Sequence, residues 1–209
     1  MNRRGFMGSL IGSTVLLASG SALARSYTGG IDYRELIPRV DPGLPAGRIQ
    51  VVEVFWYGCP HCYTFEPLVN EWSRNLPEQV EFTHMPATFN DLWALHARVY
   101  YAAVELDVLE EVHQPFFDAI HAQGRNMRSE SAVLRFIDQR GLDADAFRDA
   151  MRSEAVGEAI TEAGLLIQAF QIEGVPSMVV DGRAMVSAGM AGSHEGMLRV
   201  VDHLIEKHS

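Results

Sequence analysis

FWYGCPHCYTF, residues 55–65, contains the only two cysteines of the 209-residue chain, Cys59 and Cys62, separated by two residues. Such a pair can be a structural disulfide, half of a metal site, or a dithiol that cycles between reduced and oxidised forms. A disulfide stabilises a folded chain more when it closes a longer loop, so a disulfide between these two cysteines would add little stability. A structural zinc site needs four ligands, and the chain has no second CxxC. We therefore predict a redox-active dithiol with no metal and no cofactor.

The flanking residues place this pair where a strand meets a helix. IQVVEVFW (49–56) is almost entirely apolar and rich in β-branched residues, which is typical of a strand buried on both faces. Glu53, in the middle of this stretch, is the exception. Pro60 lies where the following helix begins, a position that tolerates proline. Apolar residues then recur at helical spacing, at Phe65, Leu68, Val69, Trp72 and Leu76.

The rest of the chain predicts an α/β core with a helical insertion. VEFTHMPATF (80–89) alternates like a strand, and residues 91 to about 171 show helical patterns with little strand signal. VPSMVVDGRAMVSAG (175–189) predicts a β-hairpin that turns at Asp181-Gly182, and Ser193 can cap a closing helix. We predict a core formed by residues 25–89 and 172–209, and an all-helical insertion of residues 90–171.

Residues 1–24 have the composition of an export signal. Arg3 and Arg4 precede an apolar run that ends in ALA (22–24), so we expect cleavage before Arg25. The paired arginines fit a twin-arginine signal as well as an ordinary secretory signal, and the sequence leaves both routes open. A retained membrane anchor is disfavoured because the run is short for a span. Outside the cytosol, conditions favour disulfide chemistry.

The composition is that of a folded, acidic protein. Hydrophobic residues make up 47% and charged residues 21%, which argues against wholesale disorder. The formal net charge is −10, without a clustered run of Lys and Arg. This charge argues against nucleic acid and against an anionic membrane surface as partners.

The position of Cys59 favours a reactive thiolate. A helix N-terminus offers unpaired N–H groups and a dipole that stabilise an anion, and a protonated His61 adds positive charge. Cys62, one turn further along, can resolve a mixed disulfide at Cys59. One pKa unit is worth about 1.36 kcal/mol, which is about 30 mV for a two-electron couple. A lowered Cys59 pKa therefore makes the dithiol oxidising, so that it gives a disulfide to substrate thiols.

GVPSM (174–178) supplies a second element. Pro176 is a candidate cis-proline beside the dithiol, where it would present the Val175 backbone to an extended substrate segment. The alternative is an ordinary trans proline at the start of a strand. The sequence alone leaves both open.

EVFWYGCPHCYTFEP, the helical insertion and GVPSMVVDG together resemble the DsbA family of periplasmic thiol:disulfide oxidoreductases. The resemblance implies a thioredoxin fold with an inserted all-helical domain. It implies that Cys59 is the exposed nucleophile, that Cys62 resolves, that His61 activates, and that Val175 and Pro176 bind substrate. DsbA is itself a standard example of a strongly oxidising dithiol, so the expected direction of transfer is not independent of the resemblance.

Glu53 matches a buried acid of that family, which there pairs with a lysine on the next strand. This chain lacks such a lysine, and His84 is the nearest candidate partner. A buried carboxyl has a raised pKa and can exchange protons with Cys62. The alternative is that Glu53 is partly solvated at a strand end.

The resemblance also implies the partners. We expect reduced exported polypeptides as substrates, a quinone-linked membrane reoxidase, a periplasmic location and a monomer. One alternative is a reductase or isomerase, although the segment before the first core strand leaves no room for an N-terminal dimerisation domain. The other is a non-catalytic metal-binding or holdase protein, which would not depend on Cys59.

Several further residues have two interpretations. Trp56, Tyr57 and Tyr63 either line an apolar peptide surface or belong to the core, and Met190 is a candidate for the rim of the same surface. The histidines of the helical block are interpreted as surface or packing residues: His96, His113 and His121.

Overall fold

The computed structural model describes residues 26–209, so the predicted export signal, residues 1–24, lies outside the described residues. The core begins with β1 (Arg34–Glu35), β2 (Ile49–Phe55), α1 (Pro60–Ser73) and β3 (Val80–Pro86). Five helices follow: α2 (Asp91–Glu105), α3 (Leu109–His121), α4 (Glu130–Gln139), α5 (Ala144–Met151) and α6 (Glu154–Ala169). The chain closes with β4 (Ser177–Val180), β5 (Ala184–Ser187), α7 (Ala188–Ala191) and α8 (His194–His208). The order confirms the predicted α/β core interrupted by helices.

A five-stranded sheet in the order β1-β5-β4-β2-β3 forms the centre of the core. β2 and β3 are parallel, and α1 supplies the crossover that a parallel pair needs. The other neighbouring strands pair antiparallel. β2 lies between β4 and β3 and is buried along nearly its whole length, as its apolar sequence predicts.

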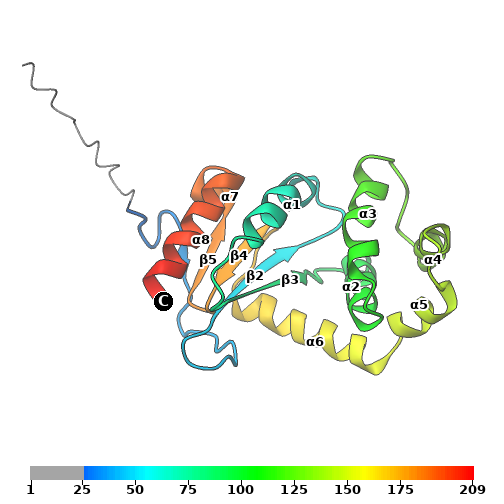
Figure 1. Ribbon diagram of the computed structural model, residues 1–209, viewed down its shortest axis with the longest axis horizontal. Helices are drawn as coiled ribbons and strands as arrows, with labels where there is room; N and C mark the ends of the chain where they lie inside the picture. Colours follow the sequence, from blue (N-terminus) through cyan, green and yellow to red (C-terminus); the bar gives the residue numbers. More distant parts are fainter. Residues whose placement is uncertain (1–25) are drawn as a thin grey trace, which may run out of the picture.

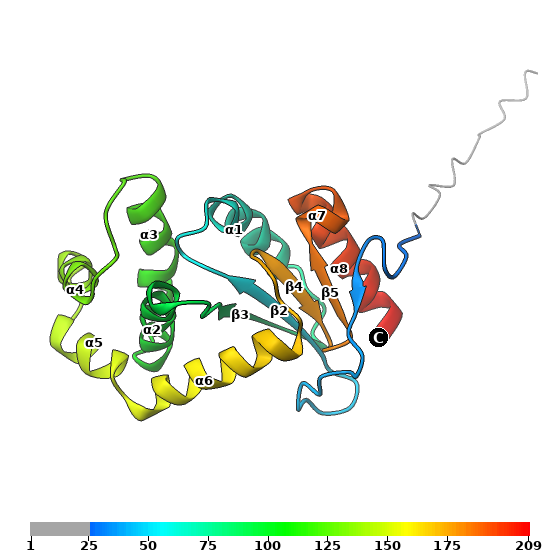
Figure 2. The same ribbon diagram turned by 180° about the vertical axis from the view of Figure 1, so that it is seen from behind.

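Helices cover both faces of this sheet (Figures 1 and 2). On one face, Ile49 and Val51 of β2 pack in a cluster with residues of α1 and α8. On the other face, Val52 and Val54 pack in a cluster with residues of α6. Because side chains alternate along a strand, Glu53 points to the same face as Val51, toward α1.

Helices α2 to α5 stand beside the sheet, and α6 leads the chain back to it (Figure 1). Their own core is rich in phenylalanine, with Phe116, Phe117, Phe136 and Phe147 almost fully buried. The same cluster includes Cys59 and Cys62. The dithiol therefore lies where the sheet's helix α1 meets the helical block. Among residues 26–209, no helix combines the length and the apolar character that a membrane crossing requires.

Local details agree with most of the sequence predictions and correct two. The hairpin turns at Asp181 and Gly182, whose φ values of 52° and 59° suit a type I′ turn. Ser193 caps α8 by accepting a hydrogen bond from the backbone N–H of Gly196. The predicted strand over residues 80–89 ends at Pro86, opposite Phe55, because the partner strand β2 ends there. The short helix α7 was not predicted.

Candidate active site

Both cysteine side chains are held by the first turn of α1. Cys59 is the N-cap residue with extended backbone, and Pro60 is the first residue of the helix. Cys62 follows one turn later. The two thiols are free, so the structure represents the reduced form. Cys59 is 8% exposed and Cys62 is 0% exposed. Cys59 is therefore the more accessible of the two cysteines, but it is mostly buried rather than exposed as the family resemblance implies.

The two sulfurs differ in acidity. Hydrogen bonding from the Cys62 thiol, helped by the backbone N–H groups of Cys62 and His61 and by the charge of His61, lowers the pKa of Cys59 to about 6 against the opposing effect of burial. Burial raises the pKa of Cys62 well above its usual value, and the hydrogen bond to Cys59 and the charge of Cys59 add to this rise. At neutral pH, Cys59 is therefore a thiolate while Cys62 stays a thiol.

A groove of about 460 Å³ opens beside the dithiol, and its lining includes His61, Val175, Pro176, Met190 and His194. The Val175–Pro176 peptide bond is cis. The carbonyl oxygen of Val175 lies 3.6 Å from Cys59 Sγ and accepts a hydrogen bond from the thiol when it is neutral. The structure thus brings Val175 and Pro176 to the reactive sulfur, and it places Met190 in the same groove.

Glu53 is fully buried and paired with His84. The parallel register of β2 and β3 sets Glu53 directly opposite His84, and His84 Nε2 lies 3.2 Å from Glu53 Oε2. Burial raises the pKa of Glu53 even though contact with His84 lowers it. The alternative of a partly solvated Glu53 is wrong, since its exposure is 0%.

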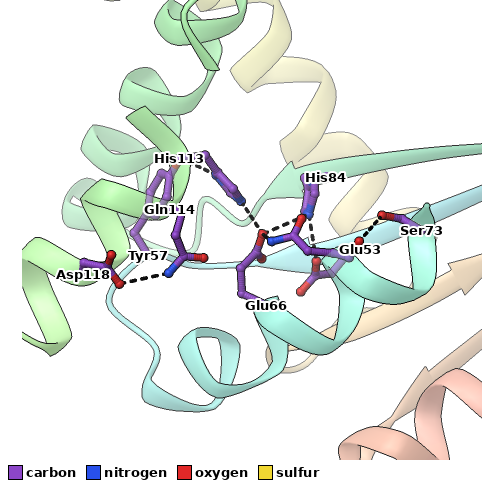
Figure 3. Close-up of polar contacts among 9 residues, drawn as sticks. Glu53, Tyr57, Glu66, Ser73, His84, His113, Gln114 and Asp118 are labelled. Atoms are coloured by element: carbon purple, nitrogen blue, oxygen red, sulfur yellow. Dashed lines mark hydrogen bonds and ion pairs between the residues drawn. The ribbon is translucent and has the colours of Figure 1, made fainter. Parts of the chain in front are cut away.

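The pair belongs to a larger cluster (Figure 3). His84 Nε2 also lies 3.7 Å from Glu66 Oε1, on α1. Glu66 Oε1 accepts a hydrogen bond from His113 Nε2 on α3 at 3.1 Å. His113 Nδ1 in turn lies 2.7 Å from the hydroxyl of Tyr57. The cluster thus joins β2, α1 and β3 of the core to α3 of the helical block.

The sequence patterns did not single out Glu66, and the interpretation of His113 as a surface or packing residue is incomplete. A signal for Glu66 existed, because it lies four residues after Cys62 and three before Val69, on one face of the helix. His113 is buried and hydrogen-bonded to two side chains, so it is more than a surface or packing residue.

The aromatic residues beside the dithiol divide between core and surface. Tyr57 is fully buried. Trp56 stacks on Trp93 of α2 with ring centroids 4.2 Å apart, and Tyr63 stacks on His121 at 4.9 Å. His121 Nε2 also lies 2.8 Å from the backbone oxygen of Tyr57. These rings connect the loop that carries the cysteines to the helical block.

Comparisons with known proteins agree with this geometry. Residues 78–194 match the family model of the DSBA-like thioredoxin domain, a segment that begins after the two cysteines. The chain is 40% identical to the thiol:disulfide interchange protein DsbA of Azotobacter vinelandii, over 98% of this chain and 97% of that protein. It is 38% identical to the protein of the same name from Pseudomonas aeruginosa, over 93% of this chain and 94% of that protein. The crystal structure of Pseudomonas aeruginosa DsbA superposes with a TM-score of 0.82 at 39% identity, covering 87% of this chain and 94% of that one.

Proposed function

The chain belongs to the DsbA family of thiol:disulfide oxidoreductases with a thioredoxin fold, and from this premise we propose that it donates its Cys59–Cys62 disulfide to reduced polypeptides. The direction of transfer is inferred from the difference in acidity between the Cys59 and Cys62 thiols. The reduced form is stabilised because Cys59 ionises with a pKa of about 6. A dithiol with a stable reduced form is a strong oxidant.

The transfer runs in two exchange steps. A substrate thiolate attacks Cys59 Sγ, the Cys59–Cys62 bond breaks, and the electron pair leaves on Cys62, which then takes up a proton. A second substrate thiolate attacks the substrate sulfur of the mixed disulfide, and Cys59 leaves as the stabilised thiolate. The substrate is oxidised by two electrons and the dithiol is reduced by two.

The other site residues act around these sulfurs. His61 and the backbone of the first turn hold the Cys59 thiolate, and Pro60 starts that turn. Glu53 supplies the proton that Cys62 needs when it leaves, and takes it back when the dithiol is reoxidised. Val175 and Pro176 border the groove, where an extended substrate segment would lie against the cysteine loop.

The cellular setting forms part of the proposal. Residues 1–24 act as the export signal, and residues 90–171 form the inserted domain between the two parts of the core, 25–89 and 172–209. The substrates are newly exported polypeptides in the periplasm, and each turnover leaves a dithiol that a quinone-linked membrane partner reoxidises. The protein acts as a monomer. The names of the relatives support the substrates and the reoxidising partner, and the composition of residues 1–24 supports export.

The test is the thiol–disulfide equilibrium of the mature protein in glutathione buffers, together with transfer to a reduced peptide that contains two cysteines. We expect an equilibrium more oxidising than glutathione, transfer of one disulfide per protein, and complete loss of transfer in Cys59→Ser. An equilibrium well on the reducing side of glutathione would instead establish a reductase. Chain-binding activity that persists in Cys59→Ser without disulfide transfer would establish a holdase.

A further inference from the structure

Two buried carboxyl groups of the cluster have opposite hydrogen-bond environments. Glu53 and Glu66 are both 0% exposed. Glu66 Oε1 accepts hydrogen bonds from Asn70 Nδ2 at 2.9 Å and from His113 Nε2 at 3.1 Å. Neither oxygen of Glu53 has a well-formed hydrogen bond within the described residues, and its contact is the ion pair with His84. N–H donors stabilise an ionised carboxylate, so Glu66 holds a negative charge more readily than Glu53.

The proton of His113 is fixed by its two partners. An ionised Glu66 can only accept, so His113 Nε2 carries the hydrogen, and the Nδ1 of a neutral ring then accepts from the hydroxyl of Tyr57. Burial lowers the pKa of His113 and raises that of Tyr57, which keeps the imidazole neutral and the phenol protonated. His113 therefore gives Glu66 a hydrogen bond without giving it a positive charge.

The counter-ion of Glu66 is then His84. His84 Nε2 lies between the two carboxyl groups, 3.2 Å from Glu53 and 3.7 Å from Glu66. An uncompensated buried charge is costly, so the favoured state of the cluster is electrically neutral. With His113 neutral, that state has Glu66 ionised, His84 protonated and Glu53 protonated. Glu53 is thus left with the proton that Cys62 requires.

We propose that Glu66 and His113 are positioning residues that divide the charges of this cluster, so that Glu66 balances His84 and Glu53 keeps a proton for Cys62. The helical block takes part through His113, which is its only member of the cluster among the described residues. The proposal rests on the proposed function, because it concerns the proton delivered during disulfide transfer. Besides Glu53 on β2, the acid–base chemistry then involves one residue on each of two helices, Glu66 on α1 and His113 on α3.

The other titratable groups that face the cluster are consistent with this division. Burial, with a smaller contribution from neighbouring groups, raises the pKa of Tyr100 on α2, so this phenol stays neutral. Cys62 on α1 is the thiol that receives the proton. Burial raises the pKa of Glu66, but hydrogen bonds from His113 and Asn70 and the charge of His84 outweigh burial and bring this pKa below its ordinary value. Burial lowers the pKa of His84, but contact with Glu53 and the charge of Glu66 outweigh burial and raise this pKa above its ordinary value.

The same atoms have to be considered as cation ligands. Donor atoms of Glu66, His84 and His113 lie within 4.8 Å of one another. Two N–H donors already fill Glu66 Oε1, and the Nε2 of His113 carries its own hydrogen, so these atoms bind each other. A chelator in the test separates the two interpretations.

The test measures how the first exchange step depends on pH. Oxidised mature protein reacts with glutathione, the reaction is quenched with acid, and the rate constant is expressed per glutathione thiolate. Because Cys62 takes a proton from Glu53 in this step, the rate falls as Glu53 ionises, and the midpoint of the fall reports that ionisation. Glu66→Gln leaves Glu53 as the only counter-ion of His84, so we expect the midpoint to move to lower pH by about one unit or more.

Matched variants separate charge division from a general structural effect. Tyr57→Phe removes the hydroxyl alone and should move the midpoint in the same direction by less. Glu71→Gln alters an exposed acid on the same helix and should leave the midpoint in place. In a Glu53→Gln background the profile should be flat, and adding Glu66→Gln should change nothing further. A midpoint that Glu66→Gln leaves unmoved, or that shifts when EDTA is added to the wild type, would overturn the proposal.

A measurement on the wild-type protein tests the same charge division without depending on a variant that folds. With ¹³C-labelled glutamate, the carboxyl resonances at neutral pH should show Glu66 ionised and Glu53 protonated. Ionised Glu53 together with protonated Glu66 would overturn the charge division. Wild-type protein that transfers no disulfide would overturn the proposed function instead, so the two failures are distinguishable.

Discussion

The low pKa of Cys59 should make the reduced protein more stable as the pH rises. A group whose pKa is lower in the folded chain than in the unfolded chain contributes stability above its unfolded pKa, and loses it as the pH falls through its folded pKa. The unfolded value for cysteine is about 8.5, and the folded value for Cys59 is about 6. The gain should therefore be nearly absent near the folded pKa and complete above the unfolded one.

The size of the effect follows from the difference of about 2.5 pKa units, which at about 1.36 kcal/mol per unit sets an upper limit of ~3.4 kcal/mol. Solvent in the open groove beside Cys59 screens part of the interaction, so we expect about half of this limit. Cys62 does not contribute within this range. Its pKa is raised, so its stabilisation is constant below the unfolded cysteine value and falls only at higher pH.

The assay is urea unfolding of the reduced protein at several pH values across this range, each compared with Cys59→Ser under the same conditions. The variant keeps every other titrating group, so the difference in unfolding free energy isolates the Cys59 thiolate. We expect that difference to grow with pH in favour of the cysteine protein. A difference that stays flat across the range would refute the stabilised thiolate, and with it the physical basis for an oxidising dithiol.

Three further substitutions test the packing that supports the site. Gly58→Ala places a Cβ against the Trp56 ring, and thermal unfolding should show a loss of about 1–3 kcal/mol. Phe116→Ala empties a fully buried position in the helical block, so urea unfolding should show a loss of about 3–5 kcal/mol. Gly182→Ala puts a side chain at a φ of 59° and against the carbonyl of Val40, and should cost about 2 kcal/mol or more while leaving the Cys59 pKa unchanged.

The sequence predicts where the dithiol and its neighbouring elements lie, because local sequence patterns determine these positions. A buried strand, a proline at the first helical position and a CxxC at the junction place Cys59 at a helix N-terminus without any tertiary information. The helical insertion follows from the helical spacing of apolar residues over five segments. The pairing of Glu53 with His84 needs only the register of two adjacent parallel strands.

The remaining part of the site depends on packing between segments that are distant in sequence. Glu66 and His113 are separated by 47 residues, and only the docking of α3 against α1 brings them together. By itself, each resembles a surface residue of an amphipathic helix. Their burial becomes predictable only once the orientation of the helical block is known, which apolar periodicity does not provide.

Gathering two carboxyl groups, two imidazoles and a phenol in one largely buried cluster costs free energy, so stability alone does not explain why the cluster is there. Apolar side chains of similar volume usually replace buried ion pairs without loss of stability, and often with a gain. The cluster therefore has to be understood through what charged groups can do that apolar ones cannot. Cys62 must gain and lose a proton in every cycle while 0% exposed. A carboxyl on the neighbouring strand, kept protonated by a second carboxyl that balances His84, meets that requirement without opening the core to water.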